Sequence, residues 1–120
     1  MIDLKPYVYQ TLTNALNTPV HYFYPPVGAA LPCTSYYEAE NQFHAQADGD
    51  EYLSSIAYVI DIWSNSAMSN GETALTIDTA MSAAGFQRAF SHDLFEPDTG
   101  IHHKTMRYKA LCTQDGILYQ

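Results

Sequence analysis

The fold is decided by residues 51–64, EYLSSIAYVIDIWS, which have the pattern of the central strand of a small sheet. Side chains two positions apart on a strand lie on the same face of the sheet. Both faces of this strand are mostly apolar, and β-branched and aromatic residues dominate it, as in a buried strand. We therefore expect a helix to cover one face and something else to cover the other. One face carries Ile56, Tyr58, Ile60 and Ile62, and the other carries Ala57, Val59, Asp61 and Trp63.

A helix and two strands are predicted before the central strand. The helix spans Asp3–Asn17, because apolar residues recur there at helical spacing. Asp3 is the expected N-cap, and Pro6 fits the first turn, where its missing amide hydrogen costs little. The strands are predicted at Val20–Tyr24 and Cys33–Gln42.

The longer of these two strands and the central strand are predicted to form an antiparallel hairpin. The polar stretch HAQADGD, residues 44–50, joins them, and its Asp48-Gly49 pair is a hairpin-turn signal. On the longer strand we expect Cys33, Ser35, Tyr37 and Ala39 on the inner face, and Thr34, Tyr36, Glu38 and Glu40 on the outer face.

A second helix is predicted after the central strand, over Asn65–Ala84. Two serines are alternative caps for its start: Ser66 suits an early start, and Ser69 has capping-box spacing for a later one. Gly85 suits the position just beyond the end of the helix, because glycine adopts the left-handed conformation found there.

Two further strands complete the predicted fold, at Phe86–Phe95, with a bend near residues 91–93, and at Ile101–Thr113. Residues 114–120 are predicted to be a short mobile tail. The order α-β-β-β-α-β-β predicts an α+β fold: an antiparallel sheet of about five strands with two helices packed on one face. The 120 residues suit a single domain over residues 1–120.

Composition limits the classes of partner. The formal net charge of −8 argues against general nucleic-acid binding, which needs clustered Lys and Arg, so we expect DNA to pass nearby without specific binding. No stretch has membrane-spanning length and no signal peptide is visible, so we expect no contact with a membrane. The ten tyrosines suit either an aromatic core alone or a core together with subunit contacts.

No catalytic, metal-binding or cofactor-binding signature is apparent, so we predict neither an enzyme activity nor a cofactor. The five histidines do not have the spacing of a metal site. Cys33 and Cys112 have no CxxC spacing, and we expect both to be free, buried thiols. Asp61 lies among apolar neighbours; it would serve as a general base, cap a neighbouring element, or pair with Arg107 or Lys109.

Charged residues are distributed unevenly along the chain. Three of the five basic residues lie in the last predicted strand, where Arg107 and Lys109 share a face and Lys104 points the other way, while acidic residues gather in the predicted hairpin. Either the basic face is solvated, or it contacts the acidic hairpin of the next subunit head to tail, a contact that can close into a ring. The candidate interface residues are Glu38, Glu40, Asp48, Asp50, Arg107 and Lys109.

Four segments of the chain carry a family resemblance. They are MIDLKPYVYQTL at residues 1–12, LPCTSYYEAEN at 31–41, EYLSSIAYVIDIWS at 51–64 and AMSAAGFQRAFSHDLFEPDTGIHHKTMRYKA at 80–110. Together they resemble the tail terminator proteins of long, flexible-tailed phages and prophages of Gram-positive bacteria, also called tail completion or tail-to-head joining proteins. The likeness covers about residues 1–112, and it is a pattern of strands and helices without a catalytic motif.

The resemblance implies a structural protein of the virion. Such a subunit is made in the host cytoplasm and forms a hexameric ring on the head-proximal end of the tail tube. The ring stops tube polymerisation and docks to the head connector. The implied partners are further copies of the chain, the tail tube protein and a head-completion or connector protein, and we expect the chain to be weakly associated or monomeric in solution. The alternatives are a head-closure or other neck protein, and a small α+β binding domain or enzyme with a pocket around Asp61 and the histidines.

Overall fold

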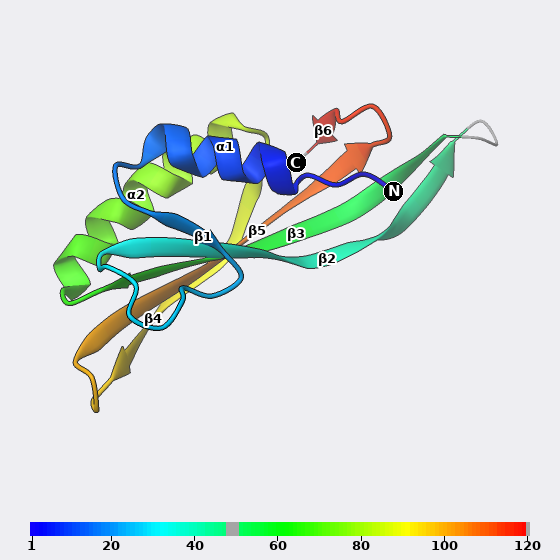
Figure 1. Ribbon diagram of the computed structural model, residues 1–120. Coiled ribbons are helices and arrows are strands. Elements are labelled where there is room, and N and C mark those ends of the chain that lie inside the picture. The colour runs from blue at the N-terminus through cyan, green and yellow to red at the C-terminus, as the bar shows by residue number, and fades with distance from the viewer. Residues whose placement is uncertain (48–50, 120) are drawn as a thin grey trace.

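A twisted sheet carries two helices on one of its faces (Figure 1). The computed structural model describes residues 1–47 and 51–119. The elements are, in chain order, α1 (Lys5–Ala15), β1 (Val20–Tyr22), β2 (Cys33–Ala47), β3 (Glu51–Ser64), α2 (Ala67–Ala83), β4 (Gln87–Glu96), β5 (Ile101–Thr113) and β6 (Leu118–Tyr119).

The strands lie in the order β1-β2-β3-β5-β4, and β6 pairs with β5. The predicted central strand is therefore β3, with the predicted bounds, and the α+β fold with two helices on one face is confirmed. The predicted antiparallel sheet of about five strands is confirmed in part: the sheet is mostly antiparallel, but it has six strands and β1 runs parallel to β2. The ten residues 23–32 return the chain to the end of the sheet where β1 began, which a tight hairpin turn cannot do.

The core lies between the helices and one face of the sheet. α1 contributes Val8 and Leu12, and α2 contributes Ile77 and Met81. The hydroxyl of Tyr108 donates a 2.7 Å hydrogen bond to Asp78 and so ties β5 to α2. On the sheet side the buried residues alternate as predicted: Ile56, Tyr58, Ile60 and Ile62 on β3, and Met106, Tyr108, Ala110 and Cys112 on β5.

The helix starts are set by local hydrogen bonds. Asp3 is not the N-cap of α1: Leu4 holds that position without a side-chain bond, and the Asp3 carboxylate accepts instead from the Lys5 amide at 3.0 Å. For α2 the early start is confirmed, because the Ser66 hydroxyl accepts from the Ser69 amide at 3.2 Å. Both helices are slightly shorter than predicted, as expected where ends fray.

The predicted faces of β2 are wrong. Tyr36 is opposite Ile60 and belongs to the core, whereas Tyr37 is opposite Val59 on the other face. A β-bulge between Glu38 and Glu40 then turns these two residues to opposite faces, because an extra residue shifts the alternation by one. β2 also continues to Ala47, so part of the predicted polar turn is strand, and the Asp48-Gly49 pair lies outside the described residues.

Smaller differences occur near the C-terminus. The irregularity in β4 lies between Arg88 and Phe90, where the register with β5 shifts, and not near residues 91–93. The predicted mobile tail instead forms a short strand, because Leu118 and Tyr119 pair with the end of β5. Both cysteines are free and buried, as predicted.

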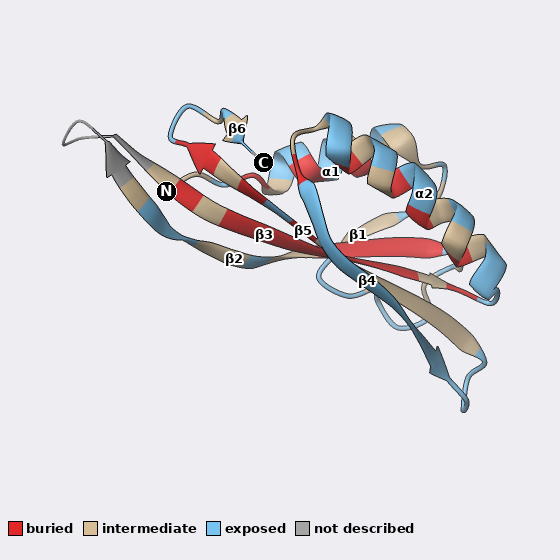
Figure 2. Ribbon diagram, turned by 180° about the vertical axis from the view of Figure 1, so that it is seen from behind, coloured by how far each residue is buried: buried red, intermediate tan, exposed pale blue. Residues whose placement is uncertain are grey.

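The molecule is elongated, with extents of 53 × 23 × 21 Å. The β2–β3 hairpin extends from one end of the sheet and the β4–β5 hairpin from the other, while the helices cover the middle (Figure 1). β4 is exposed along its whole length, in contrast to the buried middle of β3 (Figure 2). The two hairpin ends are therefore the parts of the sheet that the chain covers least.

The core assignment predicts unequal effects of two truncations on α2. Ile77→Ala should lower the free energy of unfolding by roughly 2–5 kcal/mol, because it removes a fully buried side chain and leaves a cavity. Leu75→Ala is the matched control, since Leu75 is 72% exposed and the loss should stay within about 0.5 kcal/mol. Urea denaturation followed by circular dichroism measures both, and equal losses would contradict this packing of α2.

Candidate functional site

Three of the six candidate interface residues, Glu40, Arg107 and Lys109, lie on the sheet face opposite the helices, which we call the far face. The alternation of side chains that buries even-numbered residues of β3 and β5 under the helices turns the odd-numbered ones to this face. It is formed by Ser35, Tyr37 and Glu40 of β2, Ala57, Val59, Asp61 and Trp63 of β3, and His103, Thr105, Arg107 and Lys109 of β5.

One acidic and one basic candidate, Glu40 and Lys109, lie in the same row across the far face. Glu40 is opposite Ala57, and Ala57 is opposite Lys109, so two strand spacings, roughly 10 Å, separate the backbones of Glu40 and Lys109. Glu40 accepts hydrogen bonds from Ser55 at 3.0 Å and from Gln42 at 3.1 Å. The row brings together, within one subunit, residues that the sequence pattern assigned to opposite sides of a contact.

The basic residues of this face have free charges. Arg107 is opposite Val59 of β3 and Phe90 of β4. Lys109 is exposed and is opposite Gln87, the first residue of β4. Within residues 1–47 and 51–119, no ion pair involves either side chain. Both remain available to a carboxylate of another molecule.

The remaining acidic candidates are not brought to this row. Glu38 lies on the helix side of β2, where its carboxylate is 4.0 Å from the Lys5 ammonium and accepts from Asn41 at 3.0 Å. Asp48 and Asp50 lie outside the described residues. The structure therefore unites Glu40 with Arg107 and Lys109 and separates Glu38 from them.

A largely buried polar cluster lies toward one end of the far face. Asp61 is 3% exposed, and its carboxylate lies 2.9 Å from Nε2 of His103, whose ring N–H donates to it. The His103 ring stacks on Trp63 at 3.8 Å, and the indole N–H of Trp63 donates to the Ser35 hydroxyl at 3.0 Å. The proposed partners Arg107 and Lys109 are thus not those of Asp61, and His103 is the partner that sequence reasoning missed.

The missed pair has a geometric cause. Asp61 is directly opposite Thr105, and His103 is the diagonal neighbour two residues away on β5. Diagonal neighbours are within reach of long side chains, but which residues are diagonal depends on the register of the two strands. The only signal in the sequence was a histidine on the same predicted face of the strand as Arg107.

The cluster does not have the geometry of a catalytic centre. The Ser35 hydroxyl is bonded to Trp63 and not to the histidine, so the His–Asp pair has no serine nucleophile. No group of three or more His, Cys, Asp or Glu in the described residues could hold a metal ion. The hydrogen bond from His103 to Asp61 and the one from Trp63 to Ser35 hold these side chains in place on the far face.

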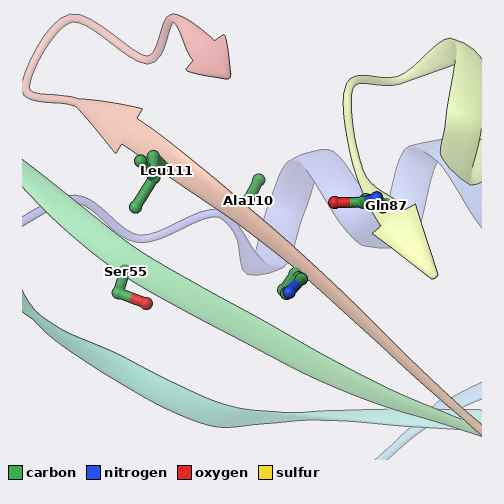
Figure 3. Close-up of a pocket in the computed structure, with 5 residues that line it drawn as sticks. Ser55, Gln87, Ala110 and Leu111 are labelled. Atoms are coloured by element: carbon green, nitrogen blue, oxygen red, sulfur yellow. The ribbon is translucent and has the colours of Figure 1, made fainter. Parts of the chain in front are cut away.

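Two hollows lie beside the far face. One is lined by Ser55, Gln87, Lys109, Ala110 and Leu111, where β4 begins to diverge from β5, and its polar groups come from three strands (Figure 3). The other lies where the loop after β1 approaches Trp63, Glu96 and Ile101, with a wall of Tyr24, Pro25, Pro26 and Leu31. The loop is thus the part of the chain that covers one end of the far face, where it stacks Phe23 on Tyr37 at 5.0 Å.

The fold is an α+β sheet with exposed hairpin ends, a charged far face and a polar cluster in which His103 pairs with Asp61. The chain belongs to the family of the tail completion protein gp17, whose family model matches residues 9–113. It is accordingly a structural protein of phage tails, associated with the virion.

Other comparisons bear on the fold alone. A chain in the solved structure "Virion of native gene transfer agent (GTA) particle" is similar, with 16% sequence identity and a TM-score of 0.53. The match covers 87% of this chain and 90% of that chain. No curated protein matches the sequence. Among the described residues, no helix is long and apolar enough to cross a membrane.

The Asp61–His103 pair predicts a graded response to substitution. Asp61→Ala should cost roughly 1–3 kcal/mol of unfolding free energy, because it leaves a buried ring N–H without its acceptor. Asp61→Asn should cost less, since the amide oxygen still accepts from His103. Asp93→Ala, which removes an exposed carboxylate from Lys104, is the control and should change stability by less than about 0.5 kcal/mol. Urea denaturation measures the three, and equal values for Asp61→Ala and Asp93→Ala would contradict the pairing.

Proposed function

We propose that this chain is the tail terminator of a long-tailed phage or prophage. Copies of it, six in the assembled virion, form a ring on the head-proximal end of the tail tube, stop polymerisation of the tube and dock to the head connector. The observation that carries the proposal is the family match over residues 9–113. Its partners are then the tail tube protein, a head-completion or connector protein and further copies of itself. Residues 1–120 act as one tail-terminator domain.

The similar virion chain supports this proposal through its fold. That chain is part of a gene transfer agent virion, and the likeness extends over most of both chains. A shared fold of this extent is compatible with a subunit that works inside a larger assembly.

The charge distribution supports head-to-tail contact between copies. Arg107 and Lys109 have no internal ion pair in the described part of the chain, and the acidic group predicted to meet them comprises Glu38, Glu40, Asp48 and Asp50. A heterologous contact of this kind generates a ring when its rotation closes. Since exposed ion pairs contribute little each, the ring is weak in solution and completes on the tail.

The same observations favour a role without turnover of a substrate. The Asp61 carboxylate accepts from His103 and is 3% exposed, and we assign it no proton-transfer step. An acidic protein with net charge −8 also repels DNA that passes through a tail, which prevents sticking.

Charge reversal tests the subunit contact. Arg107→Glu with Lys109→Glu should weaken self-association by roughly two- to fivefold per lost pair, with little change in folding stability. Adding Glu40→Lys in the same chain should restore part of the loss. Lys104→Gln is the control, because its side chain lies on the other face of β5, and its association should not change. Sedimentation equilibrium at matched concentrations measures association, and a parallel loss of fold and association would contradict the contact role.

Deletion of the gene tests the proposed function itself. Without a terminator, tails should polymerise to uncontrolled lengths and fail to join heads, while DNA-filled heads stay intact. Electron microscopy of the lysate measures tail length and attachment, with complementation by the intact gene as control. Tails of normal length attached to heads would overturn the proposal, and leaking heads beside free tails of normal length would indicate a head-closure protein.

A further inference from the structure

β4 is an edge strand that the chain leaves uncovered. Its inner side pairs with β5, and within the described residues no strand pairs with its outer side. All ten of its residues are exposed, and Phe90, Leu94 and Phe95 are exposed by 44%, 46% and 54%. Proteins usually protect such an edge by shortening or covering it, or with lysine or proline. β4 has neither lysine nor proline, so its main-chain groups are open to a further strand.

A second free edge lies at the other side of the sheet. β1 pairs with β2 only at Thr34–Tyr36, and along the rest of β2 no strand of the described chain pairs with the outer side. Bulges between Glu38 and Glu40 and between Phe43 and Ala45 leave residues 40–43 as a regular run. β2 contains no proline, lysine or arginine, so this run can also accept a strand.

The directions of the two edges suit each other. Each successive pair among β2, β3, β5 and β4 is antiparallel, so β4 runs opposite to β2. A second copy placed beside the first in the same orientation therefore presents its β2 antiparallel to β4. The two edges belong to different surfaces of one chain, so the contact is heterologous and can repeat.

Charge identifies a second copy as the occupant of the edge. Residues 33–64, which include β2 and β3, contain six acidic residues and neither lysine nor arginine. Residues 87–113, which include β4 and β5, contain four of the five basic residues of the whole chain and three acidic residues, and in the described residues Arg107 and Lys109 have no ion pair. Complementary potentials of this kind steer an encounter and fix its register.

We propose that β4 of one copy adds to the free edge of β2 in the next copy, so that the sheet continues from subunit to subunit. This inference rests on the proposed function, and it names the contact through which the ring forms. Main-chain hydrogen bonds supply the affinity. The neighbouring copy covers Phe90 and Leu94, which lie on the far face of β4.

The positions of the two edges determine how copies are offset. Glu38, Tyr58, Tyr108 and Arg88 lie in one row across the sheet. From that row the free part of β2 extends toward one end of the molecule and β4 toward the other. Each copy is therefore displaced along the strands relative to its neighbour. A staggered sheet closes on itself when its strands tilt relative to the axis, which is the geometry of a barrel.

Crosslinking between two single-cysteine variants tests the pairing. His92→Cys places a thiol on β4, and Gln42→Cys places one on the same face of the regular run of β2. A short bis-maleimide, which tolerates small differences in register, joins thiols that lie close together. The native thiols are 1% and 0% exposed, and burial raises the pKa of both Cys33 and Cys112, so the unmodified protein is the blank.

The mixture of His92→Cys and Gln42→Cys should give roughly tenfold more crosslinked dimer than a mixture of Leu75→Cys and Gln42→Cys, because pairing raises the local thiol concentration. Leu75 lies on the outer side of α2 and is the matched exposed control. The double variant His92→Cys/Gln42→Cys should form a ladder of larger species. Leu94→Asp added to His92→Cys should remove most of the crosslinking without lowering the melting temperature.

Two outcomes would overturn the pairing. If the mixture gives no more product than the control, β4 does not meet β2 of another copy. If His92→Cys alone crosslinks as well as the mixture, two β4 strands pair about a two-fold axis and the contact cannot form a ring. The result of the gene-deletion test does not depend on either outcome. Failure of the pairing can therefore be distinguished from failure of the tail-terminator function.

Discussion

The burial of both faces of β3 is the constraint on which the rest of the structure depends. Ile60 on one face and Asp61 on the other are 0% and 3% exposed, although they are adjacent in the chain. On the helix side, apolar side chains pack against β3. On the far face, the buried residue Asp61 carries a carboxylate. Removal of a carboxylate from water is costly unless it is hydrogen-bonded, and so the far face needs His103 beside Asp61.

The middle of the sheet is thus well covered, and the ends are not. Two helices of 11 and 17 residues cannot cover strands that extend over a molecule 53 Å long. The β2–β3 and β4–β5 hairpins consequently extend past the helices (Figure 1). Phe43 on β2 and Phe90 and Phe95 on β4 are exposed there. In the assembly that we propose, these ends are the surfaces that remain for contact with other molecules.

The sequence predicted those parts of the fold that are local. The period-two pattern located β3 and the buried side of β5, and the Ser66 cap located the start of α2. The parallel pairing of β1 with β2 was not predicted, because it depends on which end of the sheet the ten-residue loop 23–32 leads to. The alternation assigned Glu38 and Glu40 to one face, but the bulge between them turns them to opposite faces, since one extra residue changes every later face. Of the candidate site, the shared face of Arg107 and Lys109 was predictable, but the pairing of Asp61 with His103 required the register.

That pairing also explains why a polar cluster occurs in a protein that assembles. A buried pair is weak support for stability, because desolvation offsets most of the attraction between its members. Its value lies in register: a slip of β5 by one residue would turn His103 away from Asp61 and would move Met106 and Tyr108 out of the core. β5 carries Arg107 and Lys109 and aligns β4, so a fixed register places the charged face and the free edge correctly with respect to each other. The Asp61–His103 pair thereby helps to set the geometry of the outer surfaces.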